Sequence, residues 1–563
     1  RCSKEGGLVC VYCANPAVLS GRLRQTGLPK VGAHRSRFLC ESVQALRISL
    51  QQVGSDLLVA PEPPERWLPQ LAFAATDIES VNVVVIVAQG VTPEEKQEED
   101  DVEAALASLP FPARLERVWG LSLYHIDDLP YQSIKRDFPM VFAPFGRAVR
   151  GNFRAADAGA VSAAQKGQRG VQIREELDKP RRLPAVPAFL KRLSVQSIAD
   201  SWPAPASLDG AAYHGPGPSE SEAWWKHTFK GGESAGLARL AAFVTADLAR
   251  YKETRNGLIG LRFSSKLSPW VAAGCVSPRR VAAEIRRWEL ERRRGQPSPS
   301  SAHYVSEYGW RDYLIFLALK CGADMFKLHG PGKVDLPWIR DSNLVQRLFN
   351  ARTGMPLIDA AIREMAVTGF MSNRARQFVA SYIILELRLD WRIGAELFEC
   401  LLVDYDVCAN WGNWMRAAGV SGQGFGNGGS RWFDLAEERN RFDARGEYVR
   451  LWLPELQQVP LERLHAPWTM TREEQDATKL RLGADYPIPP STPSKLTLEG
   501  SVSAEQAAPA WHTTTRAGKR QQRSGSGWEC KNTSAERDAA AWETRRTTGR
   551  GSRRWARRDS MNG

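Results

Sequence analysis

Two apolar helical segments in the second half of the chain carry polar side chains along one face, and this pattern restricts the possible folds more than any other. Apolar residues recur every three or four positions over 378–387 and 395–402, which predicts two helices. Asp406, Asn410 and Trp414 follow at intervals of four, so we expect them to stack on one face of the second helix. Buried polar groups need partners, and either neighbouring side chains or a large flat heterocycle could supply them.

The residues at the start of the first segment allow the same two interpretations. Asn373, Gln377 and Ala380 form one stripe with Arg376 beside it, and we expect Arg376 to form an interhelical ion pair with Asp404. Buried Arg–Asp pairs between helices are common in large helical proteins. The spacing alone therefore does not separate a ligand site from a polar helix–helix contact.

The positive charge of the chain is concentrated at its C-terminal end. The 563 residues carry a formal net charge of +13, and from Trp511 onward thirteen Lys and Arg residues face five Asp and Glu residues. The length suggests about three or four domains with a large buried core. The C-terminal end could hold phosphates, whereas the rest of the chain need not be generally basic.

The nine cysteines favour a reducing intracellular compartment, which the sequence does not identify further. Cys10 and Cys13 have the spacing of a metal-binding pair, but no second pair or nearby His completes a site, so thiols of a buried strand are favoured over a metal. The longest apolar run, 81–88, is interrupted by Asn82 and is too short to span a membrane.

Strand-like and helical runs alternate in the first part of the chain, which predicts a parallel sheet with helices on both faces. The strand-like runs are 8–13, 56–59, 81–88 and 114–124, and the helical ones are 37–53 and 93–107. The expected organisation is an α/β domain over 1–145, a connector over 146–200, a helical domain over 201–468 and a disordered basic tail over 469–563.

Three motifs in the second half of the chain carry a family resemblance. They are Met371-Ser372-Asn373-Arg374, Asp390-Trp391-Arg392, and Asp404-Tyr405-Asp406-Val407-Cys408 followed by Asn410 and Trp414. They resemble the flavin-binding core of the photolyase/cryptochrome family, and most closely its cryptochrome DASH branch. The resemblance covers roughly residues 8 to 468. It implies a Rossmann-like antenna domain followed by an all-α FAD-binding domain. The family's first strand has no counterpart before Leu8, so we expect an N-terminally incomplete domain in which that strand, and any targeting peptide, is missing.

The resemblance implies FAD as the cofactor. The expected FAD-binding residues are Tyr251, Ser264, Ser265, Lys266, Leu267, Ser268, Arg311, Asn373, Arg376, Asp404, Asp406 and Asn410. The serine cluster before Pro269 could cap a helix, or bind the flavin pyrophosphate as the resemblance favours. Asp406 would accept a hydrogen bond from the flavin ring, and Asn410 would face its reactive nitrogen.

Glu307, Trp310 and Arg311 form a second stripe, at helical intervals of three and four. A surface ion pair beside a core tryptophan is the structural alternative. The resemblance implies a pocket for a flipped pyrimidine dimer formed by Glu307, Trp310, Gln377 and Arg416. Arg416 stands where duplex-repairing relatives have Trp and DASH relatives usually have Tyr, but a guanidinium can also stack on bases and pair with phosphate.

Two further features follow from the resemblance. Trp338, Trp391 and Trp414 match the family's tryptophan relay, with ordinary core packing as the alternative. A methenyltetrahydrofolate antenna is found in some relatives, but the family's folate-binding Glu falls near Gly90, which supplies no carboxylate.

The implied function is blue-light-driven repair of cyclobutane pyrimidine dimers, preferentially in single-stranded DNA. Photoexcited reduced FAD would donate an electron to the dimer, the ring would split, and the electron would return. One alternative is a blue-light photoreceptor that binds FAD and nucleic acid without efficient repair. Another is a single-strand- or RNA-binding protein with a vestigial flavin site. We expect a monomer without a bound metal, and a tail that either contacts nucleic acid or is simply solvated.

Overall fold

The described part of the N-terminal region contains four short strands that form two parallel pairs. The computed structural model describes residues 7–75, 82–149, 171–175, 179–208, 213, 229–422, 438 and 441–490. The strands are β1 (Cys10–Cys13), β2 (Leu57–Ala60), β3 (Val83–Ala88) and β4 (Ala113–Val118). β1 pairs with β2, and β3 pairs with β4. The expected parallel pairing is present, and within the described residues it forms two separate two-stranded sheets. A single Rossmann-like sheet stays a prediction.

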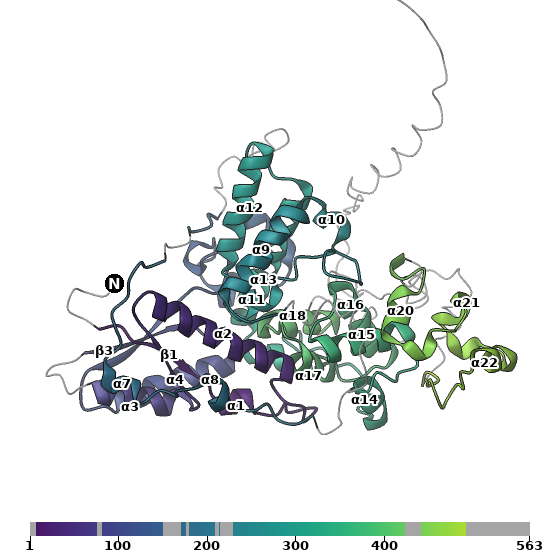
Figure 1. Ribbon diagram of the computed structural model, residues 1–563, viewed down its shortest axis with the longest axis horizontal. Helices are drawn as coiled ribbons and strands as arrows, with labels where there is room; N and C mark the ends of the chain where they lie inside the picture. The colour runs from purple at the N-terminus through teal and green to yellow at the C-terminus, as the bar shows by residue number, and fades with distance from the viewer. Residues whose placement is uncertain are drawn as a thin grey trace, which may run out of the picture. The chain divides into compact units, whose positions relative to one another are not determined.

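Helices cover both faces of the first strand pair (Figure 1). Leu57 and Val59 of β2 pack with Val43 of α2 (Ala33–Gln52) on one face. Leu58 and Ala60 pack with Trp67 of α3 (Pro64–Ala74) on the other. This alternation follows from the period of two along a strand, and it leaves β2 fully buried.

The second strand pair joins the first through shared helices. Val85 of β3 and Val11 of β1 pack against the same apolar cluster, which includes Leu106 of α4 (Pro93–Ala107). α4 begins at the predicted residue because Thr92 and Glu95 form a capping box ahead of it. The opposite face of β3 is more open, since Ile86 is 60% exposed.

Part of the expected connector packs back onto the strands. Leu183 and Val195 donate backbone hydrogen bonds to Val53 and Val59, and Ile198 joins the α2-side cluster. This segment contains the short helices α7 (Ala188–Lys191) and α8 (Ile198–Ser201). Residues 150–170 of the connector lie outside the described residues.

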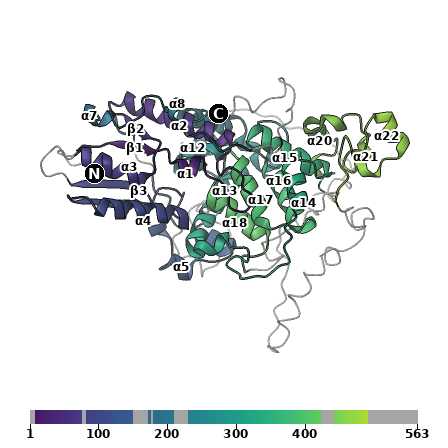
Figure 2. The same cartoon turned by 90° about the horizontal axis from the view of Figure 1, so that it is seen from below.

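Helices dominate from residue 233 onward (Figures 1 and 2). The first group is α9 (Glu233–Ala246), α10 (Tyr251–Thr254), α11 (Ser268–Ala272), α12 (Pro278–Arg293), α13 (Pro299–Cys321), α14 (Ser342–Phe349) and α15 (Pro356–Thr368). The second group is α16 (Asn373–Ser381), α17 (Trp391–Leu401), α18 (Val407–Ala417), α20 (Glu447–Trp452), α21 (Leu461–Leu464) and α22 (Arg472–Thr478). The shorter helices nearer the N-terminus are α1 (Pro16–Leu19), α5 (Ile134–Asp137) and α6 (Phe142–Val149).

The central segment contains three helices where the periodicity predicted two. α16 runs into a π-helical turn at Tyr382–Glu386, and α17 ends before the polar stripe begins. The stripe lies on a third helix, α18, because Asp406 caps a new helix by accepting a hydrogen bond from Ala409 N at 2.9 Å. Asp406 could have belonged to the polar face of one long helix, but it caps the start of a new helix instead.

Folded structure continues past the expected boundary at residue 468. α22 follows it, and Tyr486 is fully buried with its hydroxyl donating to Asp359 at 2.7 Å. The expected boundary therefore falls too early by about twenty residues. Residues 491–563, which hold most of the expected tail, lie outside the described residues.

Buried carboxylates connect the N-terminal and helical regions. Asp312 of α13 accepts backbone hydrogen bonds from Leu123 (3.1 Å) and Tyr124 (2.8 Å) in the segment after β4. Glu396 of α17 accepts from the backbone of Gln25 and Thr26. Among the described helices, none has the length and apolar character needed to cross a bilayer.

Candidate flavin and substrate cavity

A cavity of about 1180 Å³ brings together most of the site residues that the sequence predicts. Most of its lining comes from α13, α16, α18 and the turn before α18. The predicted residues on its wall are Glu307, Trp310, Asn373, Arg376, Gln377, Asp404, Asp406, Asn410, Trp414 and Arg416. Tyr251, Ser264, Ser265, Lys266, Leu267, Ser268, Arg311, Trp338 and Trp391 are not among the residues that line it.

The predicted ion pair between Arg376 and Asp404 is present. Arg376 Nη2 lies 2.9 Å from both carboxylate oxygens of Asp404, and its Nε donates to the carbonyl of Met371 at 2.9 Å. Asp404 lies in the turn between α17 and α18, so the pair joins a helix to a turn rather than two helices. The guanidinium compensates a carboxylate that is only 8% exposed, which fixes the start of α16 against this turn.

Asp406 connects the cavity to a second arginine. Its Oδ1 caps α18, and its Oδ2 accepts from Arg311 Nε at 2.9 Å. Arg311 Nη1 also donates to the carbonyl of Leu121 at 2.7 Å. Arg311 therefore acts on the cavity through Asp406, and a direct phosphate contact from Arg311 remains a prediction.

Asn410 and Trp414 occupy the predicted stripe of α18 and both reach the cavity. Asn410 Nδ2 donates to the backbone carbonyl of Ala395 on α17 at 2.9 Å, which orients its amide group. The Trp414 ring is 3% exposed and packs edge-on against Phe398 at a centroid distance of 5.1 Å. α17 thus contacts both residues, through Ala395 and Phe398.

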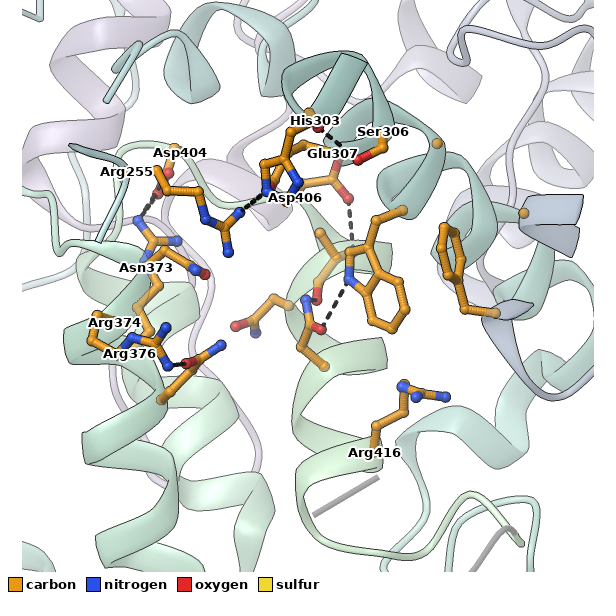
Figure 3. A pocket seen from close by; sticks show the side chains of 18 of the residues that line it. Arg255, His303, Ser306, Glu307, Asn373, Arg374, Arg376, Asp404, Asp406 and Arg416 are labelled. Carbon is orange, nitrogen blue, oxygen red and sulfur yellow. Dashed lines mark hydrogen bonds and ion pairs between the residues drawn. The ribbon is translucent and has the colours of Figure 1, made fainter. Parts of the chain in front are cut away.

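Glu307 is held by two residues that sequence analysis missed, Arg255 and His303. His303 Nε2 lies 2.6 Å from Arg255 Nη1 and 3.1 Å from Glu307 Oε1, and Arg255 also contacts Glu307 directly. All three line the cavity (Figure 3). The only available signal was the interval of four between His303 and Glu307 on a helix, and Arg255 carried none.

An aromatic and cationic wall lies beside Glu307. Trp310 is half-buried, and its indole N–H donates to Asn413 Oδ1 at 3.3 Å. The guanidinium of Arg416 lies 5.0 Å from the centroid of the Trp310 ring, and Arg416 is only 6% exposed. Burial lowers the pKa of Arg416 from its usual value. Arg416, which stands where relatives have an aromatic residue, therefore places its guanidinium over the Trp310 ring.

Gln377 is oriented by another residue that sequence analysis did not select. Arg374 Nη1 donates to Gln377 Oε1 at 2.8 Å, and its Nη2 donates to Asn256 Oδ1 at 3.1 Å. Arg374 also lines the cavity. Its position in the Asn373-Arg374 motif was the signal that could have identified it.

The cavity wall carries more positive than negative groups. The cationic residues are Lys252, Arg255, Arg374, Arg376 and Arg416, and the acidic ones are Glu307, Asp404 and Asp406. Figure 3 shows Arg374 and Arg376 close together and Arg416 apart from them. A volume of this size with cations, carboxylates and amides on its wall suits a large anionic ligand that has a polar heterocycle.

The serine cluster does not cap α11 as one interpretation expected. The N-cap residue is Leu267, no side chain caps the helix, and Ser265 Oγ instead accepts from Leu267 N at 3.3 Å. Arg239 donates to the carbonyls of Ser264 and Ser265, at 3.2 and 2.7 Å. Ser268 is the first residue of α11. Arg239 therefore fixes the backbone just before α11. Phosphate binding at this serine cluster stays a prediction.

Lys266 and Tyr251 lie in aromatic surroundings. Lys266 has a positive φ of 56°, and its Nζ lies 3.7 Å from the centroid of the Phe263 ring. Burial lowers the pKa of Lys266 to about 7. Tyr251 packs against Tyr304 at 4.9 Å, and burial raises its pKa.

The three tryptophans of the expected relay lie in different settings. Trp391 is fully buried, donates to the carbonyl of Leu328 at 3.0 Å, and has Trp411 as an edge-on neighbour at 5.7 Å. The indole N–H of Trp338 is buried and meets no acceptor among the described residues. Electron transfer through these tryptophans stays a prediction, with core packing as the alternative.

The Gly90 position leaves no space for a longer side chain. A Cβ there would lie 2.8 Å from Glu99 Oε1 and 2.9 Å from Glu95 Cβ. Glu99 in turn accepts from Arg117 Nε at 2.7 Å. Two carboxylates of α4 thus surround the position where a folate-binding Glu was expected, and an antenna chromophore stays a prediction.

Comparison with known proteins assigns both the N-terminal region and the helical region to one family. The model of the DNA photolyase domain matches residues 2–164, and that of the FAD binding domain of DNA photolyase matches residues 304–493. The chain is 38% identical to a cryptochrome DASH of Xenopus laevis over 86% of its own length and 84% of the relative's. It is 36% identical to a chloroplastic/mitochondrial cryptochrome DASH of Arabidopsis thaliana over 83% of its length and 74% of the relative's.

A solved structure confirms the arrangement of the two regions. The crystal structure of a cryptochrome from Synechocystis superposes with a TM-score of 0.72 at 35% identity, and covers 86% of this chain and 91% of that one. A class III photolyase from Agrobacterium tumefaciens shares the fold, with a TM-score of 0.64. With an N-terminal photolyase domain, a helical FAD-binding domain and this degree of identity, the chain belongs to the cryptochrome DASH group of the photolyase/cryptochrome family.

Proposed function

We propose that the protein is a FAD-dependent lyase that uses blue light to repair cyclobutane pyrimidine dimers, preferentially in single-stranded DNA. One observation carries the proposal: the Arg376–Asp404–Asp406–Asn410 set and the Glu307–Trp310 set line the same cavity. A cofactor held by the first set would lie in the same cavity as a base held by the second. Electron transfer over a short distance requires this arrangement.

The first set of residues suits FAD. When bound, FAD would supply light absorption and the transferable electron. Asp406 retains acceptor capacity toward the cavity, because a carboxylate can accept more hydrogen bonds than the two from Ala409 and Arg311. Asn410 offers a neutral amide whose NH₂ group is already directed to Ala395. The ion pair of Arg376 with Asp404 places a fixed charge pair beside these groups.

The second set of residues suits a base removed from its stack. Trp310 provides an aromatic surface, and Glu307 provides a carboxylate for the polar edge of a pyrimidine. Arg255 and His303 hold that carboxylate in place, so little side-chain entropy is lost when a base binds. Arg255 and Arg374 would pair with the phosphates that flank a flipped lesion.

A single strand is the favoured substrate because its bases are already unpaired. Extruding a dimer from a duplex costs a few kcal/mol, whereas a single strand avoids most of that cost. Arg416 occupies one stacking face of Trp310, so this pocket has less aromatic surface with which to offset the cost. An RNA strand offers the same phosphate and base groups, and we propose that the protein acts on its substrate as a monomer.

The test is repair of a dimer-containing single-stranded oligonucleotide by the purified full chain, with its absorption spectrum recorded. We expect bound flavin, repair in blue light and none in the dark, and less repair of the same dimer in a duplex. A flavin-loaded protein that repairs neither substrate would refute repair. A protein that binds dimer strands without retaining flavin would refute the whole proposal.

A second candidate is a blue-light photoreceptor that binds FAD and nucleic acid without efficient repair. Arg416 supports it, because a buried guanidinium in the stacking position favours phosphate or a normal base as much as a lesion. The photoreceptor predicts equal affinity for damaged and undamaged strands and photoreduction of the flavin without repair. The same assay therefore separates the two functions.

A further inference from the structure

α17 and α18 lie side by side (Figure 2). The Trp414 ring of α18 lies directly on Gly394 of α17. A Cβ at Gly394 would stand 2.2 Å from Cη2, 2.6 Å from Cζ3 and 2.8 Å from Cζ2 of that ring. These separations are far inside van der Waals contact, and the atoms belong to a rigid, 3% exposed indole.

The backbone of α17 does not require a glycine at this position. Gly394 lies in the interior of Trp391–Leu401 and is not among the glycines with positive φ. Glycine weakens a helix interior relative to alanine, because the unfolded chain loses more conformational freedom. The contact with Trp414 is therefore the physical reason that a glycine suits this position.

A second contact lies next to the first. Asn410, one turn before Trp414, donates to the carbonyl of Ala395, the neighbour of Gly394. Phe398, one turn after Gly394, bounds the indole edge-on at 5.1 Å. The spacing of the two helices therefore sets the placement of two cavity-lining residues at once.

We infer that Gly394 is a positioning residue whose missing side chain forms a notch for the Trp414 indole. The notch keeps α18 close enough for Asn410 to reach the Ala395 carbonyl, and so fixes both residues at the cavity wall. The notch itself rests on packing alone, whereas its effect on electron delivery to a bound flavin rests on the proposed function.

The first test compares Gly394→Ala with Gly412→Ala in the full chain. Gly412 lies on α18, and a Cβ there would meet the flexible end of Leu314 at 2.8 Å, with the next atoms at 3.6 Å. We expect Gly394→Ala to lower the melting temperature, despite the better helix propensity of alanine, and to shift tryptophan fluorescence. Gly412→Ala should do neither. Equal melting temperatures for the two variants would overturn the inference.

The second test repeats Gly394→Ala in a Trp414→Phe background. Phenylalanine lacks the distal indole atoms that the new Cβ would strike, so most of the loss in melting temperature should disappear. A loss of the same size in both backgrounds would show that Gly394 acts on something other than Trp414, and would overturn the notch.

The third test measures photoreduction of the flavin in variants with matched FAD content. We expect Gly394→Ala to slow it roughly tenfold relative to Gly412→Ala, because even a small displacement of a reacting group is costly. Unchanged photoreduction in Gly394→Ala would overturn the functional part of the inference. If Trp414→Phe also leaves it unchanged, the tryptophan relay expected from the sequence fails, while the melting temperatures still decide the notch.

Discussion

At the scale of single residues, several side chains serve structure and the candidate site together. Asp406 caps α18, pairs with Arg311 and lines the cavity. Arg416 is buried against Trp310 and also borders the proposed lesion pocket. Variants of such residues therefore need controls that separate folding from binding.

Asp406→Ala should cost the protein its flavin during purification. A lost hydrogen bond to a charged group amounts to about 1.5–3 kcal/mol, which weakens binding roughly ten- to hundredfold. The matched control is Asp341→Ala, since Asp341 caps α14 by accepting from Asn343 N (2.8 Å) and Leu344 N (3.1 Å), and it does not line the cavity. Flavin content measured by absorbance should fall only in the first variant. Full occupancy in Asp406→Ala would show that Asp406 does not contact the cofactor.

Trp414→Phe should slow photoreduction of oxidised flavin at least about tenfold without loss of flavin. Phenylalanine keeps much of the bulk but is a poorer electron donor, and a large-to-small change in a core costs about 1–3 kcal/mol that the fold can tolerate. Trp67→Phe is the control, because Trp67 is equally buried but lies in α3 of the N-terminal region. Photoreduction that proceeds at the wild-type rate with an external reductant would remove Trp414 from any relay.

Sequence reasoning found the residues of the cavity that belong to motifs and missed the residues that hold them. Asp406, Asn410 and Trp414 stand at intervals of four, so their convergence on the cavity could be predicted. Arg255 reaches Glu307 across 52 positions of sequence, and no periodicity reports such a contact. The notch at Gly394 was likewise invisible, since a helical glycine carries no signal of what packs on it.

At the scale of elements, the periods of two and 3.6 identified strands and helices but not their pairing or their ends. α4 was predicted at its observed bounds because a proline and a capping box mark its start. The two strand pairs could not be foreseen, because strand pairing depends on edges distant in sequence. The third central helix was missed because Asp406 fits both a helical face and a cap.

The contact between α13 and the segment after β4 should be sensitive to pH. Burial raises the pKa of Asp312 from 3.8 to about 7, although two backbone N–H groups favour its ionised form. A carboxyl group whose pKa is higher in the folded state binds more protons there. Its contribution to stability is therefore present below about pH 4 and is lost as the pH rises to about 7.

Thermal unfolding of wild type and Asp312→Asn at pH 5 and pH 8 measures this effect. Asparagine resembles the protonated acid. The difference in melting temperature, wild type minus variant, should therefore be smaller at pH 8 than at pH 5. The change should be on the order of 2–3 kcal/mol, or about 2–3 °C for a folded region of this size. Asp335→Asn, at a side chain that is 91% exposed, should show no such change. Parallel profiles for wild type and Asp312→Asn would contradict the assignment.

At the scale of the whole molecule, general affinity and lesion recognition should belong to different parts of the chain. Residues 491–563 lie outside the described structure, and the sequence from Trp511 onward is rich in arginine. Contacts with phosphates are independent of sequence and weaken with salt. Recognition of a flipped dimer requires the cavity.

Truncation after Pro490 should weaken binding of damaged and undamaged single strands alike and flatten its salt dependence. The cut leaves Tyr486 in place, because its bond to Asp359 belongs to the folded region. Trp310→Ala in the full chain should instead abolish the difference between the two strands, since an aromatic stacking contact contributes about 1–3 kcal/mol. Fluorescence anisotropy at several salt concentrations measures both effects. Loss of discrimination on truncation would place lesion recognition outside the cavity.

The central claim is that one cavity holds the flavin and the damaged base together. The most direct measurement is the recovery of pyrimidine absorbance after light pulses, for a dimer in a single-stranded oligonucleotide bound to the flavin-loaded full chain. The account predicts light-dependent recovery by wild type, and its loss in Trp310→Ala at unchanged flavin content. No recovery by the flavin-loaded wild type, or undiminished recovery by Trp310→Ala, would contradict it.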